Sequence, residues 1–120
     1  MLPKTFRLTL NNDIKRVLRE GKPFFTKFLN FRIFKNNLET SRFCIIISNK
    51  VDKRATIRNK IKRQISEILR LNMDKIRGGY DVNILVKSNI IDKATNKIGY
   101  DYQEIEKNIL WALEKLKMKK

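Results

Sequence analysis

The most chemically informative stretch of the sequence runs from Lys50 to Arg70, where basic side chains far outnumber acidic ones. It holds eight basic residues against Asp52 and Glu67, a net charge of +6 over 21 positions. The basic residues are Lys50, Lys53, Arg54, Arg58, Lys60, Lys62, Arg63 and Arg70. Cations in such numbers suit the phosphates of a nucleic acid, and Asn59 among them can hydrogen-bond a base edge or a 2′-hydroxyl.

The same stretch has the periodicity of an amphipathic helix over Thr56–Leu71. Apolar residues recur at spacings of three and four and define one face: Ile57, Ile61, Ile65 and Ile68. Most of the cations point away from that face or flank it. A merely solvated helix surface is the usual explanation of such a pattern, but solvated surfaces normally mix charges to form i,i+4 pairs. The imbalance therefore favours a phosphate-binding surface.

The other residue types argue against catalysis by the protein itself. The sequence has no His, so it lacks a general base that titrates near neutral pH and any Ser-His or Cys-His pair. The 12 acidic residues are scattered along the chain, and Cys44 stands alone inside an apolar run. We predict no catalytic residue and no metal site in this chain, and a self-sufficient magnesium nuclease is disfavoured for want of a carboxylate cluster.

Length and charge limit the remaining classes of protein. The chain has 120 residues, 28 Lys and Arg against 12 Asp and Glu, and a net charge of +16, which predicts one domain over residues 1–120 and a nucleic-acid partner. An anionic membrane is the rival partner, but no long apolar stretch, signal peptide or lipidation motif is visible, so we expect no membrane binding. With a single Cys, no disulfide forms within the chain, and we expect a cytoplasmic protein.

Smaller elements surround the basic helix. A short helix over Asp13–Glu20 follows Asn11 and Asn12 as candidate caps and ends at Gly21. Three strands are expected over Phe24–Phe34 (with Phe24–Phe25 as a potential extra strand), over the continuous apolar run Arg42–Ser48 as a central strand, and over Asp81–Lys87. The pair Asp101 and Glu104 predicts a capping box for a last helix, and Lys115–Lys120 reads as a frayed basic end.

This order of elements predicts an α+β fold in which helices pack on a small sheet. Five of the seven phenylalanines fall between residues 24 and 34, with Leu29, Phe31 and Ile33 on one side of the strand and Asn30, Arg32 and Phe34 on the other. Core packing is the default role of these rings. Because only one side of the strand faces helices, some of them can instead line an open sheet face where single-stranded bases stack.

Two separated segments resemble one family. Residues 51–63, Val-Asp-Lys-Arg-Ala-Thr-Ile-Arg-Asn-Lys-Ile-Lys-Arg, resemble the signature helix of the bacterial ribonuclease P protein subunit, an Arg-Asn-Arg element followed by a hydrophobic residue and Lys-Arg. Residues 2–8, Leu-Pro-Lys-Thr-Phe-Arg-Leu, are similar to the opening of that family, and Ser48-Asn49-Lys50 lies where the family tends to have Ser-Lys-Lys.

The resemblance implies an αβββαβα sandwich with a left-handed βαβ crossover through the basic helix. It implies that the chain assembles with one catalytic RNA, which removes the 5′ leader of precursor tRNA with magnesium bound mainly by the RNA, and no protein partner is evident. The residues expected to bind the RNA subunit are Lys50, Lys53, Arg54, Arg58, Asn59, Lys60, Lys62 and Arg63. The resemblance places the leader in a cleft with Phe31, Ile14 and Leu18.

Some positions depart from the family pattern. Lys60 replaces the usual second Arg, which exchanges a bidentate phosphate fork for a point charge. Ser66 stands where a further basic residue is common, and Ile14 and Leu18 stand where related proteins often carry Phe. The alternative that composition allows equally well is a non-enzymatic RNA-binding protein, such as a ribosomal or ribosome-assembly protein, and the signature helix and N-terminal match favour the ribonuclease P subunit.

Overall fold

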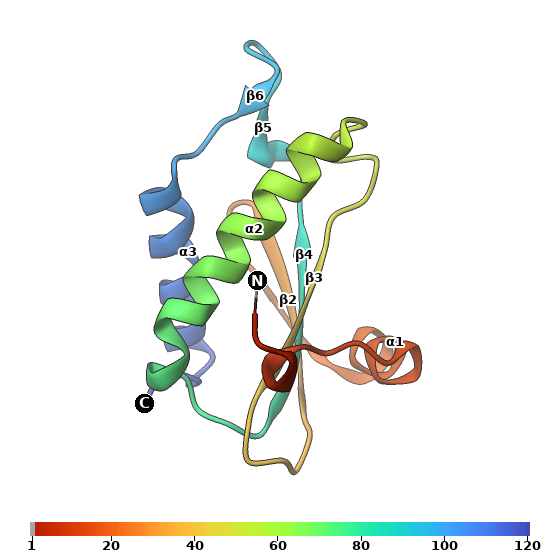
Figure 1. The fold of residues 1–120 in the computed structure, drawn as a ribbon, viewed down its shortest axis with the longest axis vertical. Helices are drawn as coiled ribbons and strands as arrows, with labels where there is room; N and C mark the ends of the chain where they lie inside the picture. Colours follow the sequence, from red (N-terminus) through yellow and green to blue (C-terminus); the bar gives the residue numbers. More distant parts are fainter. Residues whose placement is uncertain (1) are drawn as a thin grey trace.

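The structure is a computed structural model that describes residues 2–120. A four-stranded sheet with strand order β1-β2-β4-β3 carries two long helices on one face and a shorter helix on the other (Figure 1). The larger elements are α1 (Asn11–Glu20), β1 (Lys22–Phe25), β2 (Leu29–Lys35), β3 (Arg42–Ile46), α2 (Ala55–Asn72), β4 (Tyr80–Val86) and α3 (Tyr102–Lys115). Single turns η1 (Lys4–Phe6), η2 (Met73–Lys75) and η3 (Ser88–Ile90) and a small hairpin, β5 (Ile91–Asp92) with β6 (Lys97–Ile98), complete the chain. The predicted α+β order αβββαβα is confirmed.

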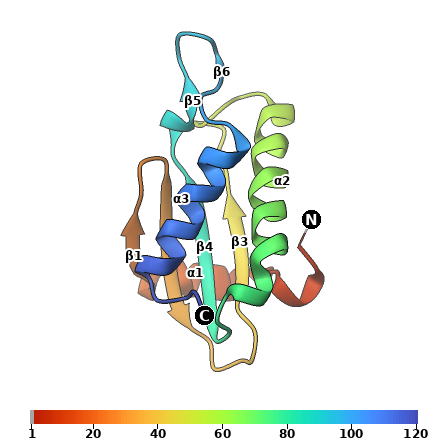
Figure 2. The same ribbon diagram turned by 90° about the vertical axis from the view of Figure 1, so that its left-hand side faces the viewer.

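The core lies between the sheet and the layer formed by α2 and α3 (Figure 2). The isoleucine stripe of α2 accounts for its side of the core, since Ile61, Ile65 and Ile68 have no exposed surface. From the sheet, Phe31 and Ile84 meet them, also with no exposed surface. Burying each such side chain contributes about 1.5–3 kcal/mol, so this layer fixes α2 in place and turns its basic side outward.

The crossover through α2 is left-handed, as the resemblance implied. Strands β3 and β4 are parallel neighbours, with Phe43 in register with Val82. In Figure 2, where the face of the sheet that carries α2 and α3 is turned to the viewer, both strands point upward and the chain passes from β3 through α2 on the right to β4 on the left. Parallel crossovers are otherwise almost always right-handed, which makes this hand a distinctive feature of the fold.

The prediction that residues 42–48 form a central strand is wrong. β3 pairs with β4 on one side and on the other meets only an isolated bridge between Arg7 and Phe43, so it is the edge of the sheet. The apolar run has another cause. Phe43 is buried beneath the helical layer, while Cys44 and Ile46 are half-buried on the opposite side of the sheet.

The aromatic segment 24–34 forms an antiparallel hairpin rather than one strand. β1 and β2 pair with Phe24 opposite Phe31, and the chain reverses at Thr26, whose Oγ1 accepts a hydrogen bond from the Leu29 N–H at 3.0 Å. The extra strand considered at Phe24–Phe25 is therefore present as β1. The same hydroxyl donates to Oδ1 of Asn108 at 2.8 Å, which ties the reversal to α3.

Two terminal features differ from the sequence prediction. Asn11 and Asn12 lie inside α1, and Leu10 is the N-cap residue without a side-chain hydrogen bond. The C-terminal residues are anchored rather than frayed, because Met118 is fully buried and the Lys120 N–H donates to the Lys75 carbonyl at 2.8 Å.

The capping box of α3 is confirmed, with Glu104 N–H donating to Asp101 at 2.8 Å and Asp101 N–H donating to Glu104 at 3.1 Å.

Candidate nucleic-acid interface

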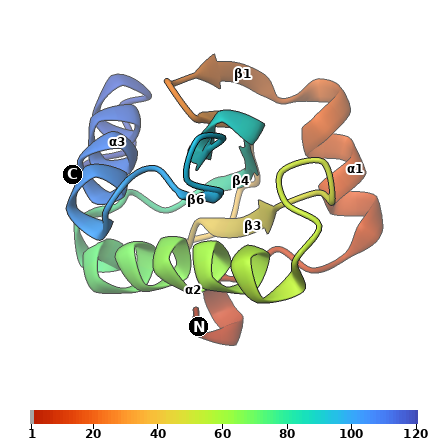
Figure 3. The ribbon, with the colours of Figure 1, turned by 90° about the horizontal axis from the view of Figure 1, so that it is seen from above.

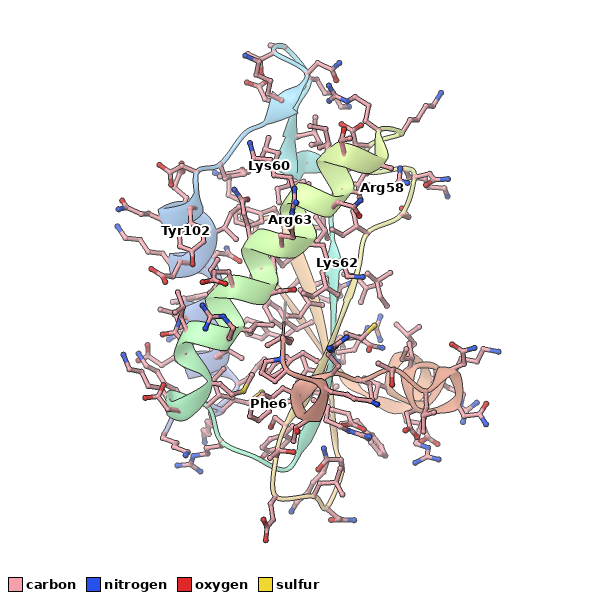
Figure 4. All side chains as sticks on the ribbon, in the orientation of Figure 1. Phe6, Arg58, Lys60, Lys62, Arg63 and Tyr102 are labelled. Atoms are coloured by element: carbon pink, nitrogen blue, oxygen red, sulfur yellow. The ribbon has the colours of Figure 1, made fainter. Side chains whose placement is uncertain are left out.

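The N-terminal half of α2 presents an exposed basic surface. Asn59, Lys60, Lys62 and Arg63 are exposed, and among residues 2–120 none of these cations forms an ion pair. Figure 4 shows Arg63 on the front of the helix, with Lys62 to the right toward β3 and Lys60 to the left. At the other end of the helix Arg70 is paired with Glu67, so the free positive charge is concentrated in the first half.

One side of this surface is hollowed. Asn59, Lys62, Arg63 and Ser66, which follow one another at helical spacings, line a depression of about 260 Å³. Ser66, which stands where the resembled family commonly has a basic residue, is a small, buried side chain in the lining of this depression. A shallow depression edged by two cations and an amide has the chemistry to hold an RNA phosphate with its neighbouring sugar.

Two of the predicted RNA-binding cations have internal partners that shape the loop before α2. The Arg58 Nη1 donates to the backbone carbonyls of Asp52 and Lys53 at 2.8 and 2.9 Å. Arg54 forms a two-pronged ion pair with Asp52, at 3.0 and 2.7 Å, and also donates to the Asn96 carbonyl. The hydrogen bond from Arg54 lowers the pKa of Asp52 to about 2. Arg54 and Arg58 therefore position the loop, whatever further contact they make.

The loop before α2 and the small hairpin enclose a second basic hollow, of about 530 Å³. Its lining includes the predicted residues Lys50, Lys53 and Arg54 and adds Lys93 and Asn96 from the hairpin. Sequence reasoning missed Lys93 and Asn96 because they lie some 40 positions downstream in a short turn without periodicity. Only the chain topology brings them to the loop, as the view from above shows (Figure 3).

Helix α1 lies on the opposite side of the sheet from α2 (Figure 3). It is fixed there by the fully buried Asn83 of β4, whose Nδ2 donates to the Ile14 carbonyl at 3.1 Å. Arg42 adds a second link, since it pairs with Asp81 at 2.7 Å and reaches Asp13 of α1 at 3.6 Å. The pairing with Asp81 raises the pKa of the Arg42 guanidinium. Leu18 is 36% exposed on α1.

The prediction that Phe31 stacks on a leader base is wrong. Its ring has no exposed surface and lies in the core with Ile84, its partner in register on β4. The α1 side of the sheet instead carries the half-buried Arg32, which is in register with Asn83. The structure thus separates Phe31 from Ile14 and Leu18, which lie across the sheet from it. In the sequence, the polar residues Asn30 and Arg32, which alternate with the apolar ones, were the signal that their side of the strand faces away from the core.

Cys44 and the acidic residues are the remaining side chains whose chemistry could support a reaction or bind a metal. Cys44 is half-buried on β3, and burial raises the pKa of its thiol, opposed by the nearby positive charge of Lys62. Within residues 2–120 no three Asp, Glu, Cys or His side chains converge as metal ligands. Within the same residues, no helix is long and apolar enough to cross a membrane.

Comparison with known proteins connects this chain to one family. The Ribonuclease P family model matches residues 2–117. The ribonuclease P protein components of Clostridium botulinum (strain 657 / Type Ba4) and Clostridioides difficile (strain 630) are 34% and 36% identical, over 93% and 88% of this chain and 95% and 87% of theirs.

Solved structures of ribonuclease P proteins have the same fold as this chain. The ribonuclease P protein of Thermotoga maritima superimposes with a TM-score of 0.80 at 28% identity, covering 91% of this chain and 96% of that one. A Staphylococcus aureus ribonuclease P protein, at 22% identity and a TM-score of 0.81, covers 96% and 98% and supports the fold alone. These matches favour the ribonuclease P reading over a ribosomal or ribosome-assembly protein. The chain belongs to the ribonuclease P protein family.

Proposed function

We propose that this protein component of ribonuclease P binds the catalytic RNA through the first half of α2 and the loop that precedes it. The observation that carries the proposal is that Lys60, Lys62 and Arg63 are exposed and, within residues 2–120, form no ion pair, on a helix anchored in the core by its buried isoleucines. Lys50, Lys53 and Asn59 extend the same surface, and Arg54 and Arg58 hold its loop in shape. A preorganised basic surface of this kind gives affinity through phosphate contacts, without reading a base sequence.

The α1 side of the sheet is the proposed site for the single-stranded leader of precursor tRNA. Ile14 and Leu18 lie on α1, and Arg32 takes the place first assigned to Phe31. The half-buried Ile14 and the exposed Leu18, beside a half-buried Arg, offer a leader both base packing and one phosphate contact. Lys62 extends from α2 toward this side, where its charge reaches Cys44 of β3, so it lies between the two proposed RNA sites.

Hydrolysis is proposed to belong to the RNA subunit with its magnesium ions, in the cytoplasm. This protein has no His and, within residues 2–120, no converging carboxylates, so its own residues bind and position RNA. By holding both the catalytic RNA and the leader, a single basic domain lowers the charge repulsion between two polyanions. The expected benefit is greatest at low magnesium, when fewer cations screen the phosphates.

Reconstitution tests the proposal that hydrolysis belongs to the RNA subunit. Precursor tRNA is incubated at low magnesium with the catalytic RNA, with the purified protein, and with both. We expect 5′-leader removal only with both components, because the protein has no residues that activate water. Cleavage by rigorously purified protein alone would contradict the proposal.

A paired substitution tests the role of α2. Replacing Lys62 and Arg63 by Ala is expected to weaken binding of the catalytic RNA and to reduce the dependence of log K on log salt by about 0.7 to 0.9 per lost phosphate contact. The matched control replaces Lys75 and Lys107, two exposed lysines on η2 and α3, by Ala. If the two double variants bind the RNA alike, α2 is merely a solvated helix.

A further inference from the structure

A groove at the end of α3 shares the chemical character of the α2 surface. It has a volume of about 490 Å³ and lies between β1 and the last turn of α3. Its lining combines lysines with aromatic and aliphatic side chains: Lys22, Phe24, Ile33, Lys35, Tyr80, Lys115, Leu116 and Lys117. Four of these eight residues are lysines, and no carboxylate is among them. We call this feature the α3-end groove.

The register of the sheet explains why the groove exists. Lys22 is opposite Ile33 and Lys35 is opposite Tyr80, so these residues share the side of the sheet that carries the core. Helix α3 ends at Lys115, before it covers this corner. The core-facing side of the sheet is therefore left open there, with half-buried apolar residues as its floor and lysines around its rim.

The four lysines of the groove are available to a ligand. All four are exposed, and within residues 2–120 none of them forms an ion pair or a side-chain hydrogen bond. Lys117 adopts a left-handed conformation (φ 60°) that turns the chain back across the end of the helix, and the buried Met118 anchors that turn. The groove is thus a built feature of the fold rather than a loose tail.

We infer that the α3-end groove binds a single-stranded segment of the catalytic RNA, an inference that rests on the proposed RNA-binding role of α2. The charge favours a polyanion, and the floor supplies the aromatic rings of Phe24 and Tyr80. Lysines along a groove with aromatic side chains in its floor are the combination that holds single-stranded nucleic acid.

The position of the groove selects the catalytic RNA over the leader. The end of α3 and the basic half of α2 lie at opposite corners of the same helix-bearing face (Figure 2). The longest dimension of the protein is 44 Å, so one large folded RNA can contact both corners. The leader is proposed to lie on the other side of the sheet, against α1.

The test compares two double variants that lose the same charge. Lys35→Gln/Lys115→Gln removes two groove cations and keeps side chains of similar length, with similar helix propensity at Lys115 on α3. The control is Lys75→Gln/Lys107→Gln. For two lost single-strand phosphate contacts the salt slope of catalytic-RNA binding should fall by about 1.4, which corresponds to about 25-fold weaker binding at 0.1 M salt and convergence near 1 M. The control should change little, and the thermal midpoint verifies folding of both.

The outcomes separate this inference from the proposed function. If the groove variant matches its control while Lys62→Ala/Arg63→Ala weakens binding, the groove inference fails and the α2 proposal stands. Loss of precursor tRNA binding with unchanged catalytic-RNA binding would also overturn the inference. Acylation of 2′-hydroxyls in the assembled complex should reveal single-stranded nucleotides that become reactive in the groove variant alone. New reactivity confined to duplex regions would refute the single-stranded assignment.

Discussion

Replacing Phe31 by Ala is the sharpest test of which side of β2 faces the core. The ring has no exposed surface and is flanked in register by Phe24 and Ile84. Removing a buried Phe side chain costs about 3–5 kcal/mol of unfolding free energy, out of a total of about 5–15 kcal/mol for a typical domain. At about 3–6 °C per kcal/mol for a chain of this size, the thermal midpoint should fall by about 9 to 30 °C.

Arg32→Ala is the matched contrast, one residue away on the opposite side of the same strand. Within residues 2–120 the Arg32 side chain has no ion pair or hydrogen bond, so the midpoint should stay within about 2 °C of the wild type. If Arg32 contacts one leader phosphate, the loss of that contact weakens precursor binding about fivefold at 0.1 M salt. Mature tRNA has no leader and should bind as before.

The assay combines circular dichroism melting with holoenzyme affinities for precursor and mature tRNA, measured well below the midpoint of each variant. Phe31→Ala should lower the midpoint and leave the ratio of the two affinities unchanged. A wild-type midpoint with selective loss of precursor binding would return Phe31 to the leader site. If Arg32→Ala affects precursor and mature tRNA equally, the α1 side is not the leader site.

Three further predictions concern the loop before α2 and the turn before β4. Arg58→Ala should lower the free energy of unfolding by about 1–2 kcal/mol, because two backbone carbonyls lose their hydrogen-bond donor. Arg58→Lys should recover only part of this loss, and urea unfolding measures both variants. Asp52→Asn should lower the thermal midpoint at pH 7. Since the pKa of Asp52 is depressed from 3.8 to about 2, its contribution to folding stability is fully present above pH 4 and is lost as the pH falls through about 2. Near that pH the wild type and the variant should have the same thermal midpoint. A difference in midpoint that stays constant with pH would exclude this ion pair as the cause. Gly78→Ala should cost at least about 2 kcal/mol, because a Cβ there would lie 1.7 Å from the Glu39 carbonyl oxygen, and an unchanged midpoint would show that the turn relaxes freely.

The sequence by itself determined the elements whose signals are local. The isoleucine spacing predicted α2 to within one residue at each end, and the Asp101–Glu104 pair predicted the cap of α3. The outward basic surface of α2 followed from the same periodicity, because a helix with one apolar face must turn its other residues to solvent. The family resemblance then supplied the hand of the crossover, which local signals do not encode.

Only the tertiary structure decided how the two faces of β2 are used. Strand alternation predicts that Phe31 and Arg32 point to opposite sides, but it does not say which side meets α2 and α3 and which meets α1. That choice depends on the register with β4, where Ile84 joins the core and Asn83 reaches α1. The edge position of β3 and the α3-end groove are likewise decided by contacts between segments far apart in sequence. Such contacts leave no periodic pattern in either segment, so they appear only once the chain is packed.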